Sequence, residues 1–412
     1  MPKTIALIES LDTKLNEALF AKECIEKEGF QALLIDNSTF HLDVNRGDVT
    51  PLEVLSELSL TQEDFEKMNK PERIATMGKA LEKFVPRLYM EGKIDGVMSI
   101  GGGQNGSMAA PCMKALPFGV PKVLSSALAC GVREMEQFVG EKDIFVAPTV
   151  ADISGLNPIT KTMIQSVCAS IMGLVQYGKT YEKEGDSKVI GATMLGETTK
   201  GTEKALELIR EGTNWETVIF HANGVGGRSM ESLMETGQIQ GVLDMTLHEI
   251  VCEVYGGFCA GANNRLLKAL ELGLPVVAAP GGLDMNDYYN DATGRALPAD
   301  FAQRKKILHN PTIYHVKVFK EEAIALAKLV CERLGSTDKP VTLVVPTKGC
   351  CQTTKPGGAI EDPEVDEVMV QAFKDYVKDN TKLVIVDTDI NDPEFAQVVA
   401  SEFKDLVKQY GW

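Results

Sequence analysis

The sequence predicts an α/β protein made of two doubly wound, Rossmann- or flavodoxin-like domains with mainly parallel sheets. Short apolar runs alternate with longer amphipathic runs from end to end, the pattern of strands that alternate with helices. A polar, charged stretch, Thr180–Ser187, separates a long helical pattern from a new strand. The 412 residues are ample for two domains. We therefore expect an N-terminal nucleotide-binding domain over residues 1–183 and a C-terminal domain over residues 188–412.

The apolar runs have the length of strands and form two series. The first series is Thr4–Ile8, Ala32–Ile35, Gly96–Ile100, Lys122–Ser125 and Ile144–Ala147. The second is Val189–Thr193, Thr217–His221, Gly241–Leu243, Pro275–Ala279, Val341–Val345 and Leu383–Val386. Helical periodicity covers Leu15–Lys27, Met108–Leu116, Ile159–Tyr177, Thr202–Arg210, Met230–Thr236, Arg265–Leu272, Glu321–Arg333, Val365–Val377 and Phe395–Tyr410. Pro111 suggests that the helix at Met108 begins late.

The composition excludes several classes of function. Lys and Arg number 42 against 58 Asp and Glu, a net charge of −16, which opposes binding to nucleic acid or to anionic membranes. We find no apolar run long enough to span a bilayer, and the N-terminal run stops at Glu9, so we expect neither a membrane segment nor a signal peptide. The odd number of cysteines, 9, indicates free thiols and a cytoplasmic location.

A glycine loop follows the third strand. Within Asp95–Ser107, the spacing of Gly101, Gly103 and Gly106 satisfies G-x-G-x-x-G. Such a loop lets backbone N–H groups approach a phosphate at a helix N-terminus. A dinucleotide site would need the first strand and an acid about 20 residues later, and neither condition is met. We therefore predict a phosphate or nucleotide cradle and no NAD site; the alternative is a tight turn without a ligand.

Further ligand contacts are expected from the loops after the first two strands. In a flavodoxin-like strand order, the loops after strands one and three adjoin the same crevice. Lys14 could meet a phosphate, Thr13 could cap the helix, and Asp12 could bind a ribose hydroxyl or metal-bound water. Asp36, at the end of the second strand, is a further ribose candidate. An ordinary N-cap role for Asp12 or Thr13 is the competing interpretation.

A second nucleotide pattern is rejected on context. Gly173–Thr180 fits G-x-x-x-x-G-K-[ST], the P-loop pattern. A P-loop requires a strand before it and a helix after it, whereas here a long helical pattern precedes it. We interpret Gly178 as the helix C-terminus.

Glycine loops also follow strands of the second series. Asn223, Gly224, Gly226 and Gly227 can form an anion nest, and Arg228 adds a cation for a carboxylate or phosphate. Similar loops stand at Ala279–Asp284 and Pro346–Cys351. Candidates for acid–base or Mg²⁺ chemistry near these loops are Asp244, Glu249 and Asp284.

One histidine raises the question of a metal. On a helix, His248 and Cys252 would share a face and could bind zinc. The sequence shows no second Cys/His pair with ligand spacing, so we predict no metal site. It also shows no G-x-S-x-G elbow that would support a catalytic triad.

Several of these stretches together resemble the Tm-one-like ATP-binding proteins, an uncharacterised family named after the tomato mosaic virus resistance protein. The matching segments run in order along nearly the whole chain: Leu11–Lys14, Ser99–Ser107, Pro148–Asn157, Phe220–Glu231, Val242–Ile250, Ala279–Met285 and Gly357–Glu367. The resemblance implies a two-domain fold, homodimers, and ATP, alone or with Mg²⁺, bound by the N-terminal domain. It places the phosphate site at Gly101, Gly102, Gly103, Gly106 and Ser107, with Asp12, Thr13 and Lys14 nearby.

Three function classes remain open. The first, which we favour, is a cytoplasmic ATP-binding protein, a homodimer with a ligand crevice between its domains, which binds without turnover. The second is an enzyme that acts on a small carboxylate- or phosphate-bearing metabolite at the C-domain glycine loops, with ATP as a cosubstrate or an effector. The third is an ATP-independent binding protein for a small organic acid.

Overall fold

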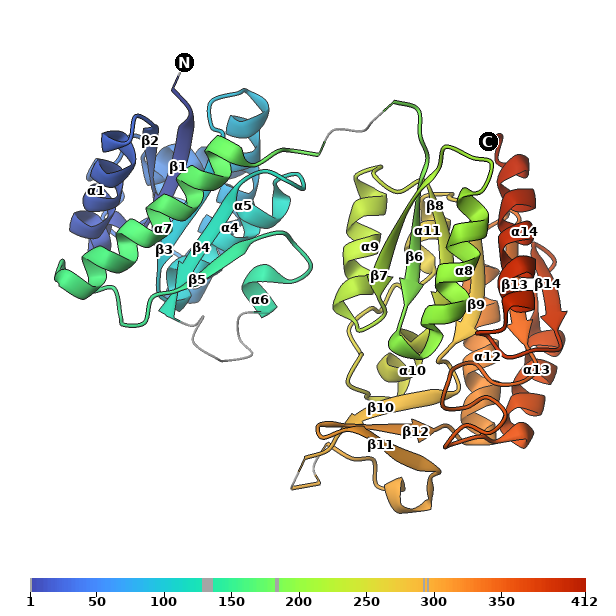
Figure 1. Cartoon of the computed structure of the whole chain (residues 1–412). Coiled ribbons are helices and arrows are strands. Elements are labelled where there is room, and N and C mark those ends of the chain that lie inside the picture. The colour runs from blue at the N-terminus through green and yellow to red at the C-terminus, as the bar shows by residue number, and fades with distance from the viewer. Residues whose placement is uncertain (1, 128–135, 182–184, 292, 295) are drawn as a thin grey trace. The chain divides into compact units, whose positions relative to one another are not determined.

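The computed structural model describes residues 2–127, 136–181, 185–291, 293–294 and 296–412. The chain divides into two compact units, Met1–Glu182 and Lys183–Trp412 (Figure 1). Each unit has its own parallel sheet.

The sheet of the first unit has the strand order β2-β1-β3-β4-β5, and every pairing in it is parallel. Its strands are β1 (Thr4–Glu9), β2 (Gln31–Asp36), β3 (Gly96–Gly101), β4 (Lys122–Ser126) and β5 (Phe145–Pro148). Its helices are α1 (Leu11–Lys27), α2 (Pro51–Leu55), α3 (Gln62–Glu66), α4 (Lys70–Met90), α5 (Gly103–Ala115), α6 (Glu136–Val139) and α7 (Pro158–Tyr177). The order reverses direction between β1 and β3, which makes that point the expected place for a ligand.

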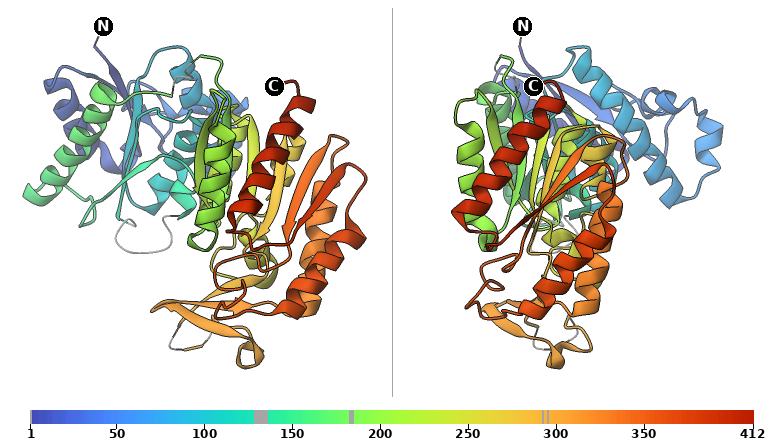
Figure 2. Two further views of the ribbon diagram at one scale, coloured as in Figure 1. Left: turned by 45° about the vertical axis from the view of Figure 1, so that its right-hand side comes forward. Right: turned by 90° about the vertical axis from the view of Figure 1, so that its right-hand side faces the viewer.

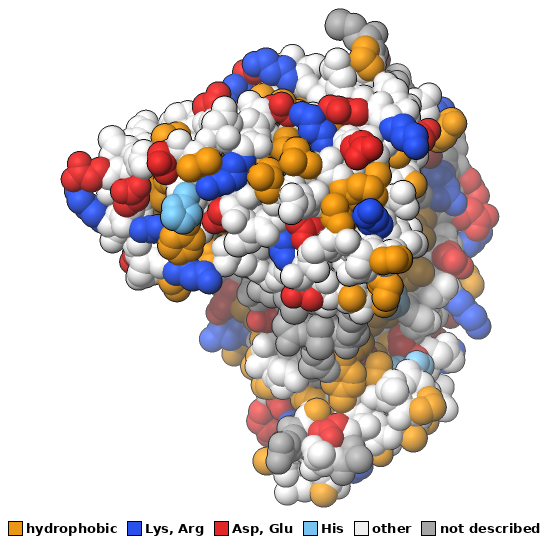
Figure 3. All heavy atoms as spheres, turned by 90° about the vertical axis from the view of Figure 1, so that its left-hand side faces the viewer, with side chains coloured by type: hydrophobic (Ala, Val, Ile, Leu, Met, Phe, Trp, Pro, Cys, Tyr) orange, Lys and Arg blue, Asp and Glu red, His pale blue; other side chains and the backbone are white. Residues whose placement is uncertain are grey.

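Helices cover both faces of this sheet because its strands are apolar on both sides. Along β1, Ile5 and Leu7 pack with α1 and α7, whereas Ala6 and Ile8 pack with α4 and α5. The two longest helices, α4 and α7, begin at side-chain caps, Asn69 and Asn157, each followed by a proline in the first turn. Figure 3 shows one face of the molecule on which Lys and Arg side chains are mixed with Asp and Glu, so no single-sign field covers it.

The second unit repeats this plan with a larger sheet, in the order β14-β13-β9-β8-β6-β7. Its strands are β6 (Val189–Met194), β7 (Glu216–His221), β8 (Gly241–Thr246), β9 (Val276–Gly281), β13 (Val341–Pro346) and β14 (Thr381–Val386). Its helices are α8 (Thr199–Arg210), α9 (Val225–Glu235), α10 (His248–Tyr255), α11 (Leu267–Glu271), α12 (Lys320–Leu334), α13 (Pro363–Tyr376) and α14 (Pro393–Gln409). Helices α8 and α14 pack on one face, and α9 to α13 on the other (Figure 2). Here the order reverses between β6 and β8.

A small antiparallel sheet lies beyond the carboxyl ends of these strands (Figure 1). Its order is β10-β12-β11, from β10 (Met285–Tyr289), β11 (Lys306–Asn310) and β12 (Ile313–Lys317). β10 follows β9 after a turn of three residues, Gly282–Asp284, so the small sheet stays against the edge where loops carry function in parallel sheets.

The structure confirms the fold class, and each predicted apolar run matches a strand of one of the two parallel sheets. The small sheet was not predicted. The late start of the helix at Met108 is wrong, because α5 begins at Gly103 and continues through Pro111. Gly78 of α4 lets α5 approach closely, and this packing holds the helix despite the proline. Among the helices that the structure describes, none combines the length and apolar character needed to cross a bilayer.

Candidate functional site

The glycine loop of the first unit lies at its strand-order reversal. Gly101 ends β3, Gly102 is the N-cap of α5, and Gly103 is the first helical residue. Gly102 has φ −92° and ψ −167°, a conformation open to any residue, and a Cβ built there would meet nothing within 4 Å. The first N–H groups of α5 have no partner within the helix, so they are available to an anion at this open position.

A buried hydrogen-bond network holds the loops after β1, β2 and β3 together. Asn105 donates to Glu9 Oε2 at 3.0 Å, and Asn37 donates to Asn105 Oδ1 at 2.7 Å. Ser10 donates to Asn37 at 2.9 Å, and the second oxygen of Glu9 accepts from the N–H of Ile100. Burial raises the pKa of Glu9 well above its ordinary value, which favours the uncharged acid. The sequence did not reveal this network, because its members come from three separate loops and only the fold brings them together.

The other predicted nucleotide contacts divide by exposure. Asp12, Thr13 and Lys14 stand in the first turn of α1 and are at least partly exposed, and Lys14 donates to the carbonyl oxygen of Ile153. Asp36 is fully buried and accepts from the N–H groups of Leu11 and Ser38. It therefore organises the start of α1 and does not face solvent.

Two further residues of the motif have local roles. Gly106 packs under Phe138, whose ring would lie 3.3 Å from an added Cβ. Ser107 is exposed, and its hydroxyl donates to the carbonyl oxygen of Gly103 at 2.8 Å. Gly101 is a second packing glycine, because an added Cβ would lie 2.9 Å from Asn105, whereas the open position of the loop is Gly102.

The rejected P-loop pattern lies on a helix. Gly173 is inside α7, and Gly178 is the C-cap of that helix, as predicted.

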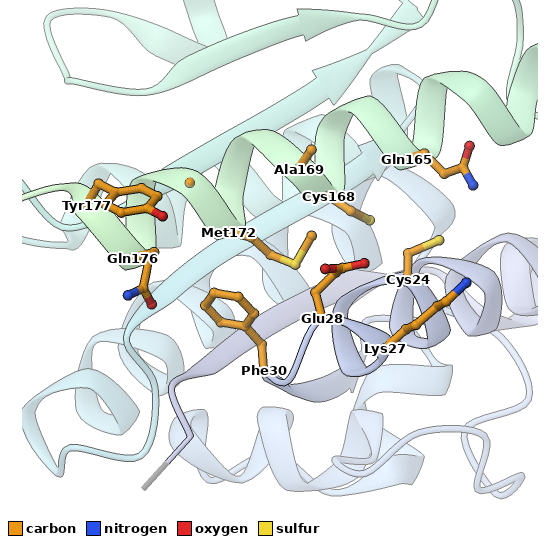
Figure 4. Close-up of a pocket in the computed structure, with 11 residues that line it drawn as sticks. Cys24, Lys27, Glu28, Phe30, Gln165, Cys168, Ala169, Met172, Gln176 and Tyr177 are labelled. Carbon is orange, nitrogen blue, oxygen red and sulfur yellow. The ribbon is translucent and has the colours of Figure 1, made fainter.

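A cavity of about 480 Å³ lies between α1 and α7, with Cys24, Cys168 and Met172 in its lining (Figure 4). It lies near the C-terminal ends of both helices, at the opposite edge of the sheet from the glycine loop.

The predicted anion nest of the second unit is occupied by the protein itself. The carboxylate of Glu249 accepts hydrogen bonds from the N–H groups of Gly224 at 2.5 Å and Gly227 at 3.1 Å. Asn223 accepts from the N–H of Gly226, and Arg228 donates to the carbonyl oxygen of Gly261. These contacts explain the glycine pattern without a ligand. The substrate site predicted at this loop stays a prediction.

The predicted acid–base residues of the second unit are buried in ion pairs. Arg265 contacts Asp244 and lies 2.9 Å from Glu249 Oε2, and the Lys317 ammonium lies 2.8 Å from Asp284. All three carboxylates are at most 1% exposed. This arrangement is that of structural ion pairs, which position the loops at the carboxyl edge.

A different cluster stands near the reversal between β6 and β8. His248 is the first residue of α10, and its Nε2 lies 3.3 Å from Cys252 Sγ and 3.3 Å from Asp287 Oδ2. Cys259, after α10, has its Sγ 3.9 Å from the same Asp287 oxygen. On the far side, His315 Nε2 of β12 lies 3.5 Å from Asp287 Oδ1.

Burial and mutual charge control the protonation of this cluster. Burial alone would raise the pKa of Cys252, but the hydrogen bond with Cys259 and the charge of His248 outweigh it and lower that pKa to about 5. For His248, Cys252 and Asp287 overcome burial and raise the pKa well above its ordinary value. The hydrogen bond with Cys252, together with burial, raises the pKa of Cys259.

Comparison with known proteins assigns the chain to a family. The N-terminal domain model of the uncharacterised protein family UPF0261 matches residues 3–180, and the C-terminal domain model of the same family matches residues 187–407. The chain belongs to the UPF0261 family. This assignment confirms the family resemblance found in the sequence, because the tomato Tm-1 proteins are relatives too.

The UPF0261 relatives match most of the chain. A UPF0261 protein of Clostridium tetani is 37% identical over 393 residues, which cover 95% of this chain and 96% of the relative. The ToMV resistance protein Tm-1(GCR237) of Solanum lycopersicum is 33% identical over 314 residues, 75% of this chain but 41% of the tomato protein. Among solved structures, MurG of Acinetobacter baumannii covers 98% of this chain and is itself fully covered, at 12% identity and a TM-score of 0.23, which supports no functional argument.

The UPF0261 sequence gave only a partial signal for the cluster. The spacing of His248 and Cys252 placed them on one helical face, and the structure confirms that contact. Cys259 and Asp287 come from other elements, so no spacing rule could find them. Their burial among polar neighbours was the feature that sequence patterns cannot show.

Proposed function

We propose that the first unit binds the phosphate groups of a nucleotide, ATP, at the loop Gly101–Gly103. The observation that carries this proposal is the open space at Gly102, where the N-terminus of α5 reaches the strand-order reversal between β1 and β3. The resemblance found in the sequence implies the same ligand and the same loop.

The electrostatics of the loop suit an anion. The helix dipole of α5 contributes about half a positive charge at its N-terminus. Lys14 supplies a positive charge in the first turn of α1, the helix that follows β1, and β1 is the strand next to β3 at the reversal. The raised pKa of Glu9 keeps a negative charge from developing beneath the loop. Asp12 and Thr13 are exposed enough to contact a ribose or a bound Mg²⁺.

Calorimetric titration of the purified protein with ATP, ADP, AMP and NAD, each with and without Mg²⁺, tests the proposal. We expect ATP to bind and NAD not to bind, and phosphate release followed in parallel tells binding from turnover. The decisive variant is Gly102→Ala, whose Cβ touches nothing in the protein but fills the space at the loop. We expect its affinity for ATP to fall at least about tenfold, or about 1.4 kcal/mol.

Gly173→Ala is the matched control. It also adds one Cβ that meets nothing within 4 Å, but on α7 inside the rejected P-loop pattern. ATP affinity should be unchanged in this variant. Equal affinity of Gly102→Ala and the parent protein, or failure of every nucleotide to bind, would remove the nucleotide site from this loop.

Homodimerisation, the ligand crevice between domains and a cytoplasmic location stay predictions of the sequence analysis. Light scattering with and without ATP measures the oligomeric state directly. The alternative function, an enzyme at the C-domain glycine loops, is less well supported, because Glu249 already occupies the N–H groups that a substrate anion would need.

A further inference from the structure

Three side chains of the second unit bring metal-binding atoms close together, and a fourth, Asp287, contacts two of them. The ligand atoms of His248, Cys252 and Cys259 all lie within 4.8 Å of one another. Asp287 Oδ2 lies 3.3 Å from His248 Nε2 and 3.9 Å from Cys259 Sγ. Ligand atoms around a tetrahedral zinc ion lie about 3.3–3.8 Å apart, since Zn–N and Zn–O bonds are about 2.0–2.2 Å and Zn–S bonds about 2.3 Å. The distances of 3.3 Å from His248 Nε2 to Cys252 and Asp287, and of 3.9 Å from Cys259 to Asp287, are close to those around a tetrahedral ion.

The orientation of His248 fits a ligand as well. Its Nδ1 lies 2.9 Å from the carbonyl oxygen of Gly282, which can only accept a hydrogen bond. Nδ1 therefore carries a proton, and loss of the other ring proton on metal binding would leave the lone pair of Nε2 directed toward Cys252 and Asp287. A backbone carbonyl that fixes the tautomer in this way is the usual outer partner of a metal-bound histidine.

We propose that His248, Cys252, Cys259 and Asp287 form a structural site for a zinc-type divalent metal ion. Two thiolates, an imidazole and a carboxylate are a donor set for Zn²⁺, whereas Mg²⁺ and Ca²⁺ prefer oxygen ligands throughout. Binding forms two metal–sulfur bonds and one metal–nitrogen bond, and it releases one proton from the Cys252–His248 pair and one from the Cys259 thiol. The inference does not depend on the nucleotide site, which lies in the other unit.

Burial favours a metal over a reactive cysteine. A nucleophilic thiolate has to be accessible to its substrate, but Cys252 and His248 are 0% exposed, and Cys259 and Asp287 are 3% and 7% exposed. Four protein ligands without an open position are the mark of a structural site. The ion would join α10, the segment after it and β10, and so would fasten the small sheet to the carboxyl edge.

A second, neighbouring group of possible metal ligands does not have the geometry for one ion. Glu197, His309 and His315 also bring ligand atoms within 4.8 Å of one another. The two histidine rings, however, are stacked at a centroid distance of 4.0 Å and an angle of 14°. Imidazole lone pairs lie in the ring plane, so one ion cannot lie in both planes.

Metal content and cobalt spectroscopy test the proposal. We expect protein expressed with added zinc to hold one zinc ion per chain, and Co²⁺-loaded protein to show a thiolate-to-cobalt charge-transfer band. Cys252→Ser and Cys259→Ser should lose the band and weaken metal binding beyond the roughly 10- to 100-fold typical of outer-partner loss. Cys331→Ser is the control, because this thiol is also buried, in α12, away from the cluster.

If a variant fails to fold, the same proposal can be tested on the unmodified protein by removing and restoring the metal. Removal of zinc by a strong chelator should lower the unfolding temperature of the second unit, and added zinc should restore it. A full-length protein that holds no zinc and gives no cobalt band would overturn the site. Equal metal binding by Cys252→Ser and Cys331→Ser would overturn its placement. Neither result bears on ATP binding, which the titrations measure separately.

Discussion

The carboxylate of Glu249 accepts a 2.5 Å hydrogen bond from the backbone N–H of Gly224, at the turn between β7 and α9. A second N–H, that of Gly227, donates to the same oxygen at 3.1 Å. The other carboxylate oxygen faces Arg265 at 2.9 Å. The anion that the glycine loop attracts is thus part of the chain, and it joins the loop to the buried arginine.

Glu249→Gln should destabilise the second unit by about 3 kcal/mol or more, because it leaves part of the charge of Arg265 buried without its partner. Urea unfolding followed by tryptophan fluorescence measures this, since both tryptophans, Trp215 and Trp412, lie in the second unit. The control is Glu271→Gln, whose side chain is 70% exposed. A full-stability Glu249→Gln protein would show that the loop does not depend on the internal carboxylate.

Glu231 should make the second unit less stable as pH rises. Burial raises its pKa to about 7, against the opposing charge of Arg265. An acid whose pKa is raised on folding binds more protons in the folded state, so its contribution is complete below about pH 4.5 and is lost as pH rises through 7. The loss is on the order of 3 kcal/mol at most.

Glu231→Gln removes this titration, so its unfolding free energy should decline less between pH 5 and 8 than that of the parent protein. Urea titrations across that range, read by tryptophan fluorescence, give the two slopes. Glu271→Gln, being exposed, should keep the parent slope. Parallel curves for Glu231→Gln and the parent would mean that Glu231 titrates normally.

The fold was predictable wherever burial and hydropathy coincide. Strands such as β1 and β9 are buried along nearly their whole length and are mainly apolar, so the sequence showed them directly. β10 is also buried, but it carries Asn286 and Asp287, whose side chains contact Tyr288 and His248. Hydropathy cannot distinguish such a strand from a polar loop, because the compensating partners come from other elements.

The site was predictable in position but not in chemistry. Glycine spacing located the loops at Gly101 and Gly224, and both lie at carboxyl ends of parallel strands. Whether the anion is a ligand or a side chain depends on a residue far along the chain, as Glu249 shows. The same reason hid the cluster at His248, because Asp287 reaches it from another sheet.

Lys179→Ala should leave ATP affinity within about twofold, under about 0.5 kcal/mol. The reason is that Lys179 follows the C-cap of α7, and a helix C-terminus carries the negative end of the helix dipole, which disfavours a phosphate. Calorimetric titration compares it with Lys14→Ala, which should bind ATP more weakly because Lys14 lies in the first turn of α1, directly after β1, the strand that pairs with β3. If Lys179→Ala weakened ATP binding more than Lys14→Ala, the nucleotide would have to bind at the rejected P-loop pattern.

Lys317→Met should be among the most damaging single changes in the second unit. Its ammonium is 2% exposed and lies 2.8 Å from Asp284 and 3.0 Å from Asp366. Methionine fills a similar volume but leaves two buried carboxylates facing each other, which should lower the unfolding free energy by about 3–5 kcal/mol. Lys320→Met, at an exposed pair with Glu364, should change it by less than about 1 kcal/mol. If Lys317→Met unfolds like the parent protein, Asp284 is not held by this ion pair and returns as a candidate for acid–base chemistry.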